Sequence, residues 1–170
     1  MGNNLKRTLA LFLCVLILIP LYGCSVLGNL KTKIQNDPKN RAKDEAEEIF
    51  GLMKDKDLES LTGLFSPEMQ ERYNIRNQWK IFFEHIDGNL VSYKSISMPG
   101  EGQSYGSDGE INNSHYSVNY SGVKTDNGTV YSEFGYYKVA TDRNNPETEG
   151  INVFTMKDPV TGEWISVGGE

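Results

Sequence analysis

Two histidines are the side chains best suited to acid–base chemistry near neutral pH. The chain of 170 residues holds only His85 and His115, and histidine ordinarily changes charge between pH 5 and 8. His115 falls in a segment that alternates with aromatic residues, and His85 follows Phe82-Phe83 in a helical segment. A histidine in either position more often packs against the core than takes part in catalysis. The spacing of the two histidines is not the His-Glu-x-x-His pattern of a zinc site. We therefore predict neither a metal site nor a cofactor.

One carboxylate and several aromatic side chains form a second group with chemical potential. Glu133 lies among aromatic residues in a strand segment, where it would be a general base if it faced the interior and a solubilising residue if it faced water. Aromatic rings with a polar atom suit pocket walls, although filling a core is their commoner role. The sequence predicts a pocket without assigning a catalytic residue; its expected members are Trp79, Tyr93, His115, Glu133 and Tyr137.

Motifs for phosphate, calcium or thiol chemistry are not supported by residue spacing. The glycines of residues 100–106 lack the strand-to-helix context of a phosphate loop. Asp108-Gly109-Glu110 lacks the ordered ligand spacing of a calcium loop. Cys14 and Cys24 both precede the segment expected to fold, which excludes a disulfide framework or a cysteine nucleophile in that segment. The sequence therefore offers no catalytic constellation.

The N-terminus has the three zones of a secretory signal. Lys6 and Arg7 give a positive start, and residues 9–19 form an apolar run that Pro20 ends. This run is shorter than the roughly 20 residues that a transmembrane helix needs. The segment Leu21-Tyr22-Gly23-Cys24 resembles the lipobox of bacterial lipoproteins. The resemblance implies lipidation of Cys24 and a lipid-anchored place on the extracytoplasmic face of the cell membrane; an ordinary signal peptide or a short uncleaved anchor is the alternative.

Composition and charge indicate one globular domain behind this signal. The chain is 38% hydrophobic and 24% charged. The first 23 residues hold two basic and no acidic residues, so their removal takes the net charge from −6 to −8. An acidic domain has no basic face for nucleic acid and is repelled by an anionic membrane surface. We predict a signal peptide over residues 1–23, a lipidated tether over 24–39 and one domain over 40–170, with the lipid bilayer as a partner through the acylated Cys24.

Within the domain, helical periodicity comes first and strand periodicity follows. Helices are expected to begin at Asp37-Pro38, Asp57 and Ser66-Pro67, and a further helix around Trp79 is expected to end at Asp87-Gly88. Strands are expected over 90–98, 114–121, 129–140, 151–157 and 163–167, with turns at 126–128 and 158–162 and a loop over 99–113. This order predicts an α+β fold, with N-terminal helices packed on one face of a curved antiparallel sheet of about four to five strands.

The layout also resembles a known fold. The segment Asp57-Leu58-Glu59-Ser60-Leu61, leading into Leu64-Phe65-Ser66-Pro67, is similar to the nuclear-transport-factor-2-like (cystatin-like cone) fold. It is most similar to an uncharacterised group of bacterial lipoproteins with that domain. The resemblance implies a cone with a pocket, as in ketosteroid isomerase and scytalone dehydratase, and a sheet face able to form a homodimer. A fold by itself carries no activity.

Three functions follow from these observations. The leading hypothesis is a membrane-tethered, non-enzymatic binding or accessory domain that holds a small ligand or an envelope protein. The alternative is a small pocket enzyme, of isomerase, dehydratase or hydrolase type, that uses His115 or Glu133. A purely structural envelope protein is the third, and it predicts an interior filled by aromatic rings. If both His115 and Glu133 point away from the interior, the enzyme hypothesis loses its basis.

Overall fold

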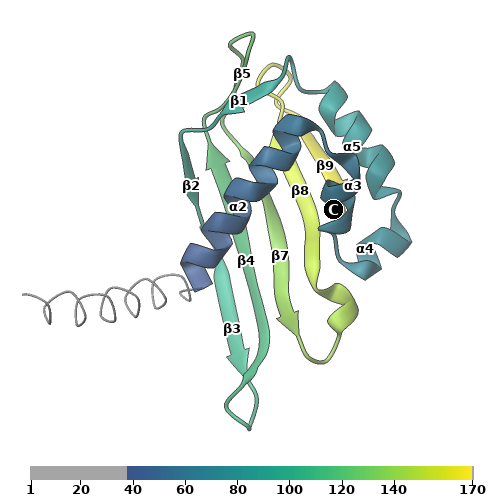
Figure 1. The fold of residues 1–170 in the computed structure, drawn as a ribbon, viewed down its shortest axis with the longest axis vertical. Helices are drawn as coiled ribbons and strands as arrows, with labels where there is room; N and C mark the ends of the chain where they lie inside the picture. Colours follow the sequence, from purple (N-terminus) through teal and green to yellow (C-terminus); the bar gives the residue numbers. More distant parts are fainter. Residues whose placement is uncertain (1–37, 170) are drawn as a thin grey trace, which may run out of the picture. The chain divides into compact units, whose positions relative to one another are not determined.

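The computed structural model describes residues 38–169; the signal peptide, Cys24 and the tether up to residue 37 lie outside the described residues. The chain divides into two compact units, Met1–Glu45 and Ala46–Glu170. The first is described only at the beginning of helix α2, which continues into the second. None of the described helices has the length and apolar character needed to cross a membrane. The strands all belong to the second unit (Figure 1).

Residues 38–169 contain four α-helices, one short 3-10 helix and nine strands. The helices are α2 (Pro38–Asp55), α3 (Leu58–Gly63), α4 (Pro67–Arg72), α5 (Ile75–Glu84) and η1 (Pro146–Thr148). The strands are β1 (Leu90–Ser92), β2 (Ser95–Ser97), β3 (Glu101–Tyr105), β4 (Ile111–Ser121), β5 (Val123–Thr125), β6 (Val130–Tyr131), β7 (Phe134–Asp142), β8 (Gly150–Lys157) and β9 (Trp164–Gly168).

The predicted α+β fold class is wrong, because the described structure is mostly β. Its nine strands form two antiparallel sheets. One sheet has three strands in the order β1-β5-β6. The other has six, in which β2-β4-β7-β8-β9 follow one another and β3 also pairs with β4. Three of the four α-helices between residues 38 and 169 have ten residues or fewer. The expected single sheet of four to five strands therefore missed a second sheet and several short strands.

Two segments explain why the strands were undercounted. Residues Glu101–Tyr105 lie in the predicted loop, yet they pair with β4 as strand β3. Their Gly- and Ser-containing composition disfavours a strand in isolation, and pairing with a long neighbour overrides that preference. The strand predicted over 90–98 is two strands in different sheets, because β1 pairs with β5 and β2 pairs with β4. Alternation within one segment cannot reveal that its two halves have different partners.

Local signals for helix starts and for one turn are confirmed. The Asp57 carboxylate accepts a hydrogen bond from the Ser60 backbone N–H at the start of α3. The Ser66 hydroxyl accepts one from the Met69 backbone N–H at the start of α4, directly before a proline. The turn at residues 126–128 joins β5 to β6. These features are readable from sequence because each depends on a side chain and a backbone group only a few residues apart.

We call the face of the six-stranded sheet that packs against the helices the inner face. The buried side chains at its centre come from β4, β7 and β8, and they are Val118, Tyr120, Phe134, Tyr136, Phe154 and Met156. From α5, Trp79 packs on Phe154 with ring centroids 5.1 Å apart. From α2, Ala46 presents its carbonyl to the Tyr120 hydroxyl, which donates a hydrogen bond of 2.7 Å. Aromatic rings thus fill much of the space between helices and sheet.

A short backbone connection ties the helical region to strand β8. Phe65 and Ile151 form an isolated parallel bridge. The Ser66 N–H donates to the Ile151 carbonyl at 3.0 Å, and the Ile151 N–H donates to the Leu64 carbonyl at 2.9 Å. The Ser66 hydroxyl also donates to the Asn152 side-chain oxygen, 86 residues later in the chain. This connection fixes the segment between α3 and α4 against the sheet.

Candidate functional site

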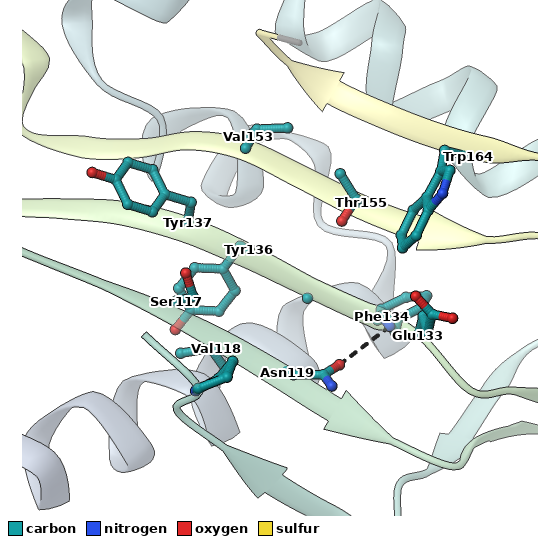
Figure 2. A pocket seen from close by; sticks show the side chains of 12 residues that line it. Ser117, Val118, Asn119, Glu133, Phe134, Tyr136, Tyr137, Val153, Thr155 and Trp164 are labelled. Carbon is teal, nitrogen blue, oxygen red and sulfur yellow. Dashed lines mark hydrogen bonds between the residues drawn. The ribbon is translucent and has the colours of Figure 1, made fainter. Parts of the chain in front are cut away.

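The opposite side of the six-stranded sheet, which we call the outer face, holds an open depression of about 300 Å³. The side chains that four neighbouring strands direct outward line it, namely Ser117, Asn119, Tyr137, Val153, Thr155 and Trp164, with Pro99 and Glu133 at its margin. Figure 2 shows Tyr137 and Trp164 at opposite ends, with Val153 and Thr155 between them. The depression therefore has aromatic ends and a largely polar middle.

The centre of the depression is open because β7 has a glycine there. Gly135 lies opposite Asn119 of β4 and Thr155 of β8. A Cβ atom at this position would overlap the Val118 carbonyl oxygen and lie 3.1 Å from the Asn119 Cα. Any side chain would force β4 and β7 apart, since both neighbouring atoms belong to the backbone. Gly135 thus permits close pairing of β4 and β7, and it leaves the floor of the depression free of side-chain atoms.

Trp164 forms one wall, and a balanced charge pair lies beside it. Its side chain is 53% exposed. The Lys157 Nζ lies 5.7 Å from the ring centroid and 3.5 Å from the Glu133 Oε1. The ammonium therefore contacts both the negative face of the indole and a carboxylate, which is a favourable arrangement for a cation. Because the two charges offset each other, this end of the depression presents little net charge.

Hydrogen-bonding groups occupy the middle of the depression. The Asn119 Oδ1 accepts a long bond of 3.5 Å from the Phe134 backbone N–H, which orients the amide (Figure 2). Ser117 precedes Asn119 by two residues and so lies on the same face of β4. Thr155 lies across the sheet on β8. Two aromatic walls separated by amide and hydroxyl groups can bind a ligand that has both apolar surfaces and hydrogen-bonding groups.

Three of the five residues predicted to form a pocket lie on the outer face. Glu133 and Tyr137 line the depression. His115 lies farther along β4, with its ring centroid 5.8 Å from that of Tyr137 and its Nδ1 3.3 Å from the Asn113 Oδ1. The imidazole covers Gly102 of β3, where a Cβ atom would come within 2.6 Å of the Cε1 and Nε2 atoms. The structure thus gathers these three residues on one sheet face.

The other two predicted pocket residues face the core. Trp79 is fully buried, and its indole stacks on Phe83 with ring centroids 5.5 Å apart. Tyr93 packs edge-on against Phe50 of α2 at 4.8 Å. Burial raises the pKa of the Tyr93 hydroxyl, and the Glu47 carboxylate adds to that effect. Trp79 and Tyr93 are therefore separated from Glu133, Tyr137 and His115 by the sheet itself.

Sequence reasoning missed Trp164, Asn119 and Thr155 as members of one site. For Trp164 and Thr155, the signal that could have found them is the register of the β8–β9 hairpin, in which Trp164 lies opposite Lys157. Side chains alternate between faces along a strand, so Trp164 and Thr155 share the face of Lys157. The turn at residues 158–162 was predicted from the sequence.

Acidic side chains away from the depression stabilise turns. Hydrogen bonds from the backbone N–H and side chain of Asn89 lower the pKa of Asp126. Backbone N–H groups of Thr161 and Val160 lower the pKa of Asp158 in the β8–β9 turn. Over residues 38–169, no group of three or more His, Cys, Asp or Glu side chains is placed to hold a metal ion. The Asp158 carboxylate therefore acts on its own turn, whereas the Asp126 carboxylate joins the β5–β6 turn to Asn89, directly before β1.

Comparison with known proteins places this site within a family. Among curated proteins, no sequence matches the chain. The family match runs from residue 48, within α2, to residue 159, just after β8. It includes every residue that lines the depression except Trp164. Because residues 48–159 are more than half of the 170, the chain belongs to the family described as a domain of unknown function, DUF5104.

Proposed function

We propose that this protein is a lipid-anchored lipoprotein on the extracytoplasmic face of the cell membrane, with a non-enzymatic binding domain whose ligand site is the outer-face depression. The anchor is supported by the signal-like residues 1–23 and the lipobox-like segment that ends at Cys24. The binding site is supported chiefly by one observation. A half-exposed Trp164 borders an open, glycine-floored depression, whereas Tyr120, Phe134, Tyr136 and Phe154 on the inner face are buried.

Two contacts favour binding over catalysis at this face. The Glu133 carboxylate lies within ion-pair distance of Lys157, so an ammonium already engages the group that the enzyme alternative needs as a base. The His115 ring lies beside Tyr137 and over Gly102. Both candidate bases thus lie on the outer face, whereas the enzyme alternative required at least one of them to face the interior. We accordingly adopt the binding function and not the isomerase, dehydratase or hydrolase alternative.

The anchor is tested by labelling growing cells with radioactive palmitate. The wild-type chain should incorporate label, and Cys24→Ser should not. Cys14→Ser is the matched control, because Cys14 lies in the segment expected to be cleaved off, and it should label as the wild type does. Label retained on Cys24→Ser, or lost from Cys14→Ser with Cys24 intact, contradicts lipidation at Cys24.

The binding site is tested by hydroxyl-radical footprinting of the same chain in intact cell envelopes and after purification. An occupied depression should protect Trp164 and Tyr137 from oxidation in the envelope relative to the purified protein. Tyr105, which is 64% exposed on strand β3 and outside the depression, is the internal control and should oxidise equally in both samples. Equal oxidation of Trp164 in both samples contradicts an occupied site on this face.

A further inference from the structure

We propose that the ligand of the outer-face depression is a neutral saccharide, an inference that rests on the binding function proposed above. Such a ligand has both apolar and hydrogen-bonding surfaces. A sugar ring has faces formed by C–H groups and an edge formed by hydroxyl groups. A site for it needs an exposed aromatic plane, short hydrogen-bonding side chains at the height of the ring edge, and no unbalanced charge. The depression meets each of these needs with a different set of residues.

The aromatic plane is Trp164. A large aromatic ring that is 53% exposed beside a concave surface leaves apolar area that a ligand can cover, and aromatic rings dominate the binding energy of such sites. Tyr137 lies at the far end of the depression, on the same face and two strands away from Trp164 (Figure 2). Two aromatic side chains at opposite ends can contact successive rings of an oligosaccharide that lies across the strands.

The hydrogen-bonding groups are short and lie between the two rings. Ser117, Asn119 and Thr155 line the depression at its middle. Their hydroxyl and amide groups both donate and accept hydrogen bonds, as sugar hydroxyls do. Gly135 keeps the floor between Asn119 and Thr155 free of side-chain atoms, so that a ring resting there can reach both side chains. This arrangement favours a hydroxyl-rich ligand over a purely apolar one.

The charges at the site favour a neutral ligand. An anion would meet the Glu133 carboxylate and a chain whose net charge is −6. A cation would have to displace Lys157, whose ammonium already lies over Trp164 and beside Glu133. A neutral saccharide has neither obstacle, because it can contact the exposed part of the indole while the ion pair stays in place.

The experiment titrates the full chain, held in a detergent without a sugar headgroup, with three neutral tetrasaccharides: cellotetraose, maltotetraose and tetra-N-acetylchitotetraose. Tetragalacturonate is the anionic comparison. Trp79 is fully buried and Trp164 is half exposed, so stacking on Trp164 should shift the emission to shorter wavelength and reduce iodide quenching. At least one neutral tetrasaccharide should bind saturably, with a Kd that salt does not change.

Variants separate the site from the rest of the surface, with ligand-observed NMR as a readout that needs no tryptophan. Trp164→Ala should raise the Kd by about tenfold or more, because a central aromatic contact is lost, and Trp164→Phe should recover part of the affinity. Tyr105→Ala, a change at an exposed aromatic residue outside the depression, should leave the Kd unchanged.

Three results would overturn the saccharide inference. The first is no saturable binding of any neutral tetrasaccharide up to about 10 mM, beyond the weakest affinity of a specific site. The second is binding that survives Trp164→Ala. The third is salt-dependent binding of tetragalacturonate alone. If footprinting still protects Trp164 in the envelope, the binding function stands and only the ligand class is wrong; if that protection is also absent, both fail.

Discussion

Replacing Tyr120 by phenylalanine removes a single hydroxyl group from the interior of the protein. The Tyr120 side chain is fully buried on the inner face. Its hydroxyl donates a 2.7 Å hydrogen bond to the Ala46 carbonyl, which belongs to helix α2. The two residues are 74 positions apart, so the bond joins the helix to β4. The substitution keeps the aromatic ring and its packing on Phe50, whose centroid lies 5.7 Å away.

The size of the effect depends on what the Ala46 carbonyl does afterwards. A buried acceptor left without any partner costs about 1–3 kcal/mol, whereas the net value of an ordinary hydrogen bond is about 1 kcal/mol. Ala46 lies inside α2, so its carbonyl also accepts the i+4 bond of the helix. The carbonyl therefore loses one of two partners. We expect Tyr120→Phe to lower the free energy of unfolding by about 1 kcal/mol.

Urea denaturation followed by far-ultraviolet circular dichroism measures this change. With an m-value of about 2 kcal/mol/M, the midpoint should fall by about 0.5 M while m stays constant. Tyr105→Phe is the matched control, because Tyr105 is largely exposed and its hydroxyl donates only to Gln103 on the same strand. A midpoint for Tyr120→Phe equal to that of Tyr105→Phe would refute the reasoning, since it would mean that the bond between α2 and β4 adds no stability.

Three further changes test other parts of the structure. Gly135→Ala should destabilise the protein by about 1–3 kcal/mol, because its Cβ overlaps the Val118 carbonyl; a thermal midpoint equal to wild type would contradict the close approach. Ser66→Ala should lower the free energy of unfolding, measured by urea denaturation, by about 1–2 kcal/mol, because α4 loses its capping acceptor. A free energy of unfolding equal to that of the wild type would show that the cap adds no stability. The pKa values of Asp126 and Asp158 are lowered in the folded state, so their contribution is complete above the ordinary aspartate value near 4 and is lost as the pH falls below it. The urea midpoint should therefore drop as the pH falls below about 4, and Asp126→Asn should reduce that drop; an unchanged pH profile would exclude Asp126 as a cause.

Features that depend on near neighbours in the chain were predictable. The caps at Asp57 and Ser66 and the turn at residues 126–128 each pair a side chain or a glycine with backbone only a few positions away. These local hydrogen bonds can form in any tertiary context, because the groups that make each bond are close together in the chain. The positions of helices α3 and α4 follow from them.

Features that depend on strand pairing were not predictable from one sequence. Residues Glu101–Tyr105 become a strand only because β4 extends beside them. The register of β4 with β7 shifts between Ser114 and His115, and such a bulge changes which face the following residues occupy. Alternation alone therefore left the face of His115 open.

The candidate site was only partly predictable for the same reason. Glu133 and Tyr137 were named from residue chemistry, and they do line the depression. The aromatic character of Trp79 suits a pocket wall equally well, yet Trp79 is buried on the inner side of the sheet, against Phe154. Only the order of the strands distinguishes an aromatic ring of the core from one on the opposite surface.

The bridge between Phe65 and Ile151 bears on when this chain can fold. During synthesis, α3 and α4 leave the ribosome long before β8 and β9, which close the sheet near the C-terminus. Until those strands are made, Leu64 and Phe65 have no partner strand, and the helices have only part of a sheet to cover. Folding that must wait for contacts between segments so far apart in the chain is slow. A chain exported in the unfolded state, as the proposed lipoprotein would be, is thereby kept from completing its core before translocation.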